Sequence, residues 1–145
     1  MTIQYVLLDD RETPLPIGGE GYLKALVVIE KEMTEAQKRD LARQLIGAGA
    51  FYVCTWGIDC ERMHDAVDNA GMEREQLEPR SLEEYPVVMT TWHSKESLDE
   101  ALWFFKALAF HPDLALDRSL IVHVADQDGS DEFLAAFEAT SLEKL

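Results

Sequence analysis

Short apolar segments alternate with helical patterns four times along this chain. The apolar segments are rich in β-branched residues and span residues 24–30, 51–55, 86–92 and 120–125. Each is followed by apolar residues at helical spacing, with polar or glycine-rich stretches between. Strands that alternate with helices predict a parallel sheet covered by helices on its faces.

The first two helices have recognisable starts and stops. Thr34 and Gln37 have the spacing of a capping box, and Gly47 and Gly49 follow the last apolar residues of that helix. Asp59 predicts the N-cap of the second helix, which would run to about Ala70 with Gly71 behind it. The polar residues 72–85 predict a loop, with a turn of helix within it as the alternative.

The later helices follow the same logic. Ser97 and Glu100 repeat the capping-box spacing before residues 101–110, which are apolar nearly all round. They predict a helix that is largely buried or covered by a neighbour, with Trp103 in the core. Ser130 opens a last helix, and Ile3–Leu8 adds an edge strand whose direction stays open. We therefore expect a single α/β domain over residues 1–145. It would be a three-layer sandwich with a mainly parallel sheet of four to five strands, in a Rossmann-like or flavodoxin-like order, and helices on both faces.

The charge of the chain limits its partners. Its 28 acidic and 13 basic residues leave a formal net charge of −15. Such a surface repels nucleic acids and anionic membranes and favours a basic protein partner, although solubility alone explains it equally well. The chain shows no apolar run of about 20 residues and no secretory signal at its start, so we expect a cytoplasmic protein.

The carboxyl ends of the predicted strands carry most of the chemically interesting side chains. In an open parallel sheet the loops after the strands share one edge, where ligands usually bind. The segment after the second strand holds Trp56, Asp59, Cys60 and His64, and later strands end in Trp92-His93 and in Asp126 and Asp128. The two tryptophans could form an aromatic platform or anchor a partner, and packing of the loops is the equal alternative.

Three segments at or near this edge resemble a known group of sequences. Residues 56–65 (WGIDCERMHD), together with TTWH at 90–93 and SLDEALWF at 97–104, are similar to a family of uncharacterised bacterial proteins. That family has no assigned activity, so the resemblance implies no mechanism. It draws attention to the same edge of the sheet.

A cysteine nucleophile is one chemical interpretation of this edge. Cys60 would lie in the first turn of its helix, where the dipole lowers a thiol pKa, and His64 or His93 could act as the base. However, Cys60, Met63, Val67 and Ala70 also form a stripe that is typical of a core-facing helix surface. We favour core packing and keep the nucleophile as the alternative.

Metal and nucleotide sites are less well supported by the sequence. His64 and His93 with carboxylates at 59, 126 or 128 are acceptable metal ligands, but they follow no metal-binding spacing, and His111 and His123 suit structural roles. Residues 18–21 precede a strand and residues 47–49 follow a helix, whereas a phosphate-binding glycine loop joins a strand to a helix. We predict no metal and no cofactor.

The favoured function is a non-enzymatic protein-binding module of the immunity, inhibitor or adaptor type. It would use the carboxyl edge of its sheet, with Trp56, Asp59, Trp92, Asp126 and Asp128 as binding residues. The alternative is a small hydrolase or transferase with Cys60, His64 and His93 as catalytic residues. A homo-oligomer joined through the apolar helix 101–110 is also open.

Overall fold

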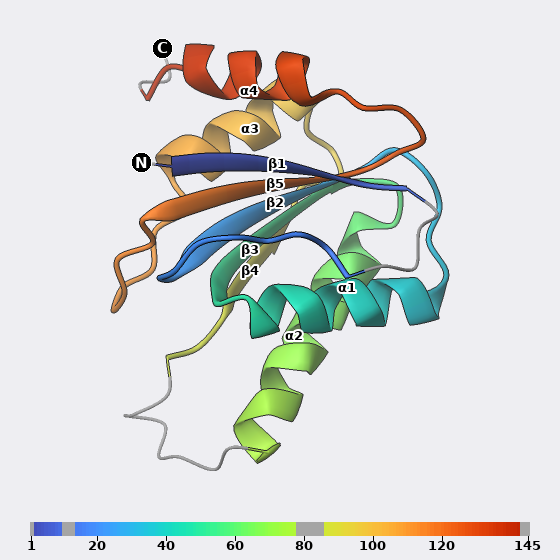
Figure 1. Ribbon diagram of the computed structural model, residues 1–145, viewed down its shortest axis with the longest axis vertical. Helices are drawn as coiled ribbons and strands as arrows, with labels where there is room; N and C mark the ends of the chain where they lie inside the picture. Colours follow the sequence, from blue (N-terminus) through green and yellow to red (C-terminus); the bar gives the residue numbers. More distant parts are fainter. Residues whose placement is uncertain (1, 10–13, 78–85, 143–145) are drawn as a thin grey trace.

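The computed structural model describes residues 2–9, 14–77 and 86–142. A sheet of five parallel strands forms the middle layer, in the order β1-β5-β2-β3-β4 (Figure 1). The strands are β1 (Thr2–Leu8), β2 (Leu23–Ile29), β3 (Ala50–Gly57), β4 (Met89–Trp92) and β5 (Arg118–Val124). The predicted edge strand is therefore parallel to its neighbour β5.

Two helices cover each face of this sheet (Figure 1). Helices α1 (Glu35–Gly47) and α2 (Cys60–Leu77) pack on one face, and α3 (Leu98–Ala107) and α4 (Ser130–Ala139) pack on the other. Successive strand residues point to opposite faces, so Val53 belongs to the first core and Cys54 to the second. The predicted three-layer α/β sandwich is confirmed.

The central strand β2 shows why the apolar runs were informative. All seven of its residues are buried, as expected for a parallel strand covered on both faces. Lys24 is buried as well: its Nζ donates to the Phe105 carbonyl at 2.6 Å near the end of α3. Burial lowers the pKa of Lys24. Its ammonium group thus satisfies carbonyl oxygens that the end of the helix leaves without partners.

The predicted helix starts are largely confirmed. The Thr34 hydroxyl accepts from the Gln37 N–H at 3.1 Å, and the Gln37 side chain accepts from the Thr34 N–H at 2.8 Å. Ser97 accepts from the Glu100 N–H at 3.1 Å and caps α3. Gly49, with φ of +93°, follows α1 as predicted.

The end of the second helix was predicted wrongly. Gly71 lies inside α2, which continues to Leu77, so residues 72–77 are helical and only 78–85 of the predicted loop fall outside the described residues. Glycine ends a helix through a left-handed conformation, and Gly71 does not adopt one. Tertiary contacts support the extension, because Arg74 donates to the Ile46 carbonyl of α1 at 2.6 Å.

The third helix is also less buried than expected. It ends at Ala107, and the apolar residues beyond it include Phe110, which is 68% exposed. Trp103 is half-buried instead of lying in the core. Helix α3 buries Ala101, Leu102 and Phe105, and its other residues between 103 and 107 are partly buried. In the described ranges, no helix is long and apolar enough to cross a membrane.

Candidate functional site

The segments that follow β2, β3, β4 and β5 meet at one edge of the parallel sheet. We call residues 30–35, 56–65, 92–100 and 125–132 the carboxyl rim. Within it, β2 and β5 are neighbours, but the helices that follow them, α1 and α4, pack on opposite faces. Such a reversal opens a crevice between strand ends, which is the usual ligand position in parallel α/β sheets.

A chain of hydrogen bonds fills this position. The Gly129 N–H donates to the Tyr5 hydroxyl at 2.9 Å, and the hydroxyl bonds to His123 Nδ1 at 2.6 Å. His123 Nε2 in turn bonds to Glu30 Oε1. The Glu30 carboxylate can only accept, so Nε2 of His123 carries the proton that faces it. In the neutral ring Nδ1 then accepts from the Tyr5 hydroxyl, whose oxygen accepts from Gly129.

This chain links three strands and the start of α4. His123 is 4% exposed and packs on Phe133 with 4.6 Å between ring centroids, whereas Glu30 is at the surface. Burial raises the pKa of Tyr5. The sequence suggested a structural role for His123 but gave no sign of its partners, because Tyr5 and Glu30 meet it only through the strand order.

Acidic residues of the last loop lie beside this crevice. Lys31 pairs with Asp126 at 3.0 Å, and the Asp126 side chain is 77% exposed. Asp128 accepts from the Ser130 hydroxyl at 2.8 Å and from its N–H at 3.3 Å. Asp126 and Asp128 therefore lie on the rim, where we expected them, and both have partners within the chain.

The turn between β3 and α2 has a strained backbone that presents one apolar side chain. Gly57 has a φ of +104°, and a Cβ there would lie 2.1 Å from the Ile29 carbonyl oxygen. Asp59 is also left-handed, with φ of +52°, and its carboxylate lies 3.5 Å from Lys38 Nζ. This differs from the extended backbone of an ordinary N-cap. Between them, Ile58 is 40% exposed.

The two tryptophans share the rim but lie on opposite faces of the sheet. Trp56 packs with the α3 and α4 core, and its Nε1–H donates to the Glu96 carbonyl at 2.8 Å. Trp92 contacts His64 of α2, with 4.5 Å between ring centroids, and is 44% exposed. The structure therefore brings them to one edge without forming a shared aromatic platform.

The side chains of the three candidate catalytic residues, Cys60, His64 and His93, have different hydrogen-bond partners. Cys60 is 2% exposed, and burial raises the pKa of its thiol, although backbone hydrogen bonds from His93 and Gly57 oppose this. The His93 side chain is buried between Thr91 Oγ1 at 2.9 Å and Glu96 Oε2 at 2.6 Å. Both of its ring nitrogens are thus engaged away from the cysteine.

His64 lies in a different set of contacts on α2. Its Nδ1 is 3.1 Å from Asp65 Oδ1, and its Nε2 is 3.4 Å from Asp68 Oδ2. One ligand atom from each of these three residues lies within 4.8 Å of the others, a spacing that could hold a metal ion. Asp68 also accepts from the Thr90 hydroxyl at 2.7 Å, which fixes this group beside Trp92.

The rim is strongly acidic. Its four segments contain 13 acidic residues and three basic ones, Lys31, Arg62 and Lys95. Lys31 is paired with Asp126 and Arg62 with Glu35. Elsewhere, Lys106 donates to the Phe137 carbonyl at the end of α4, and Arg118 donates to the Gly21 carbonyl. Lys106 and Arg118 therefore bind backbone carbonyl groups outside the rim and do not neutralise its acidic residues.

Fold and surface together define a class: a three-layer, parallel-sheet α/β protein with an acidic carboxyl rim and an exposed tryptophan on it. The chain belongs to the family described as "Domain of unknown function (DUF7684)", which matches residues 3–140. The expected membership of an uncharacterised family is confirmed at that level. The comparison with curated proteins found no match to this chain.

Proposed function

We propose that this protein is a non-enzymatic binding module whose carboxyl rim recognises a basic protein. The observation that carries the proposal is Trp92, a large indole left 44% exposed within a rim of 13 acidic residues. Tryptophan is enriched at the energetic centres of protein interfaces. Surrounding carboxylates would attract a basic surface and accelerate the encounter with it.

The apolar part of this surface suits a protein partner. Ile58 is 40% exposed on the same rim, and Trp92 is supported by the side chain of His64. The His64 side chain is only 13% exposed, so the indole rests on a largely buried neighbour. A supported aromatic ring loses little conformational freedom on binding, which favours affinity.

Affinity capture with matched variants tests this proposal. Wild-type protein, Trp92→Ala and Phe110→Ala are immobilised and exposed to lysate of the source organism at low salt. Phe110 is the control because it is an exposed aromatic residue, 68% accessible, that follows α3 at the opposite edge of the sheet. We expect a basic protein that the wild type and Phe110→Ala retain and that Trp92→Ala loses.

Salt provides the second readout. Raising the ionic strength should release this protein, because the attraction between exposed charges is screened. Circular dichroism of each variant checks that the fold is intact. Equal capture by Trp92→Ala and wild type, or binding that is indifferent to salt, would refute the proposed surface.

A further inference from the structure

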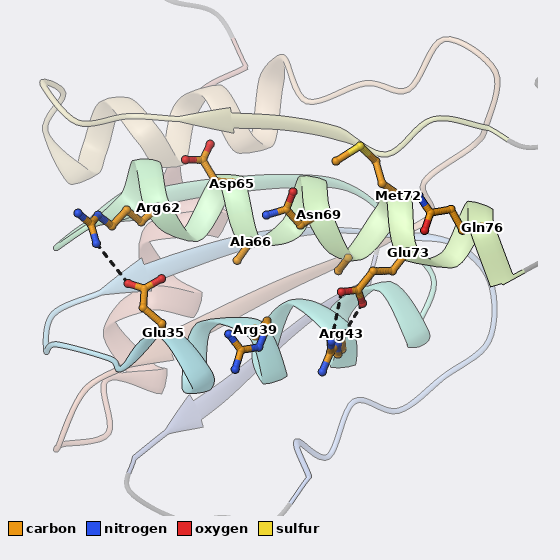
Figure 2. A pocket seen from close by; sticks show the side chains of 11 residues that line it. Glu35, Arg39, Arg43, Arg62, Asp65, Ala66, Asn69, Met72, Glu73 and Gln76 are labelled. Carbon is orange, nitrogen blue, oxygen red and sulfur yellow. Dashed lines mark hydrogen bonds and ion pairs between the residues drawn. The ribbon is translucent and has the colours of Figure 1, made fainter.

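A groove lies between helices α1 and α2 (Figure 2). Unlike the acidic carboxyl rim, it is lined by both arginine and acidic side chains. Its volume is about 590 Å³. Residues of α1 at a spacing of four, Glu35, Arg39 and Arg43, line one wall. Facing residues of α2 line the other wall, among them Arg62, Asn69 and Glu73.

Ion pairs join the two walls at both ends of the groove (Figure 2). At one end Arg62 lies 3.5 Å from Glu35. At the other end Arg43 donates twice to Glu73, at 3.1 Å and 3.2 Å. The hydrogen bonds from Arg43 lower the pKa of Glu73, and the nearby charge of Arg39 lowers it further.

Arg39, between these pairs, has no such contact within the described residues, and a longer-range attraction to Glu73 acts on it. It is exposed, and among residues 2–9, 14–77 and 86–142 it forms no hydrogen bond or ion pair. In Figure 2 the α2 residues Ala66 and Asn69, which carry no charge, lie across from it. The carboxylate of Asp65, in contrast, points away from α1 and contacts His64. The groove is thus a ladder of Arg–carboxylate pairs in which the middle carboxylate is missing.

We propose that this groove binds a segment of another protein through one carboxylate that pairs with Arg39. A guanidinium group binds a carboxylate through two parallel hydrogen bonds. This geometry fixes the orientation of the carboxylate in addition to the attraction between the charges. The small side chain of Ala66 leaves room for that approach, and Met72, 53% exposed at the far end, offers an apolar contact.

The surroundings define the kind of segment. The net charge of −15 repels a segment that is acidic throughout. A single aspartate or glutamate within a neutral or basic stretch fits both the local cation and the overall charge. This proposal does not depend on the proposed function, because its contacts lie in the groove and not at Trp92.

Nuclear magnetic resonance of the arginine side chains tests the groove. The probe is an acetylated nine-residue alanine peptide amide with one central glutamate and two lysines, and its matched peptide has glutamine in place of the glutamate. We expect the glutamate peptide to shift the Arg39 Nε–H signal selectively and the glutamine peptide not to. Arg39→Gln should weaken peptide binding about fivefold, the upper range for an exposed ion pair.

Two substitutions of Asn69 provide the sharper test. Asn69→Asp puts the missing carboxylate into the ladder, so it should compete with the peptide and weaken binding about as much as Arg39→Gln. Asn69→Ala removes the amide without adding charge and should bind like the wild type. Arg39 and Asn69 are both exposed, so the fold should tolerate the substitutions at these two positions.

Several results would overturn the proposal. Equal binding of the two peptides, or undiminished binding by Asn69→Asp, would show that no carboxylate enters the ladder. Equal shifts with acetate at the same concentration would reduce the groove to a non-selective anion contact. Self-association that Arg39→Gln abolishes would make a second copy of the chain the occupant. None of these results depends on whether Trp92→Ala loses the basic partner in the affinity-capture experiment. The proposal for the rim and the proposal for the groove can therefore fail separately.

Discussion

Tyr5 and His123, 118 residues apart in the chain, are joined by a hydrogen bond of 2.6 Å between the phenol oxygen and Nδ1. The bond exists because β5 lies between β1 and β2 and places the two residues on adjacent strands. It connects the edge strand to the central part of the sheet and, through Glu30, to the surface.

Replacing Tyr5 by phenylalanine should lower the free energy of unfolding by about 1 to 3 kcal/mol, because two polar groups lose their partner. His123 Nδ1 and the Gly129 N–H would then be left without the hydroxyl that both contact. Urea denaturation measures the change, with Tyr22→Phe as the control because Tyr22 is 47% exposed. Equal midpoints for wild type and Tyr5→Phe would show that the hydroxyl contributes nothing.

Replacing Gly57 by alanine should cost more than about 2 kcal/mol of stability, because the backbone conformation and the space both oppose a side chain. The Cβ would meet the Ile29 carbonyl oxygen at 2.1 Å. Gly47→Ala is the matched control: nothing lies within 4 Å of its Cβ position, and that glycine is helical.

We expect Gly47→Ala to be neutral or to stabilise the protein by up to about 1 kcal/mol. Thermal and urea unfolding of both variants provide the comparison. A Gly57→Ala protein as stable as Gly47→Ala would mean that the turn after β3 is not held in this conformation.

The thiol of Cys60 should react slowly with a disulfide reagent in the native protein at neutral pH. The residue is 2% exposed, and burial raises its thiol pKa, so little reactive thiolate is present. Cys54→Ala leaves Cys60 as the sole thiol and makes the signal unambiguous. The rate in urea provides the fully exposed reference. Rapid labelling of the native chain would revive the alternative of a cysteine-based hydrolase or transferase.

Stability should fall as the pH rises from about 9 toward 12. Burial raises the pKa of the Cys54 thiol from 9.0 to about 12, so the unfolded chain loses this proton at a pH where the folded chain keeps it. The stability from the protonated thiol is therefore complete below the unfolded pKa and lost as the pH approaches the folded value. Burial raises the pKa of Tyr52 to about 12 and acts in the same direction, while the lowered pKa of Lys24 acts against it.

Cys54→Ala isolates the contribution of that thiol. The variant should be less stable than the wild type at pH 7, because the buried sulfur is lost. Its stability should nevertheless decline less steeply between pH 9 and pH 12. Parallel curves for variant and wild type, from urea denaturation at each pH, would contradict the assignment of this pH dependence to Cys54.

Local patterns in the chain were enough to predict most of the architecture. The capping pair Thr34 and Gln37 and the buried run of β2 depend on neighbours within a few residues, so their signals are present in the linear sequence. The stripe of Cys60, Met63, Val67 and Ala70 is buried as its spacing indicates. Gly71 was misleading because a glycine stops a helix only in a left-handed conformation, and tertiary contacts at Arg74 favour continuation.

The arrangement of the rim depended on information that no single segment carries. The buried strands have similar apolar patterns, so the sequence indicates that four of them are parallel but not which strand lies beside which, and it leaves the direction of the first strand open. The position of β5 between β1 and β2 brings Tyr5, His123 and Glu30 together. The side chains of Trp56 and Trp92 point to opposite faces of the sheet, so they pack in different helical layers. Hydrophobic periodicity therefore determined the layers and their composition, whereas side-chain packing between distant segments decided which polar groups meet.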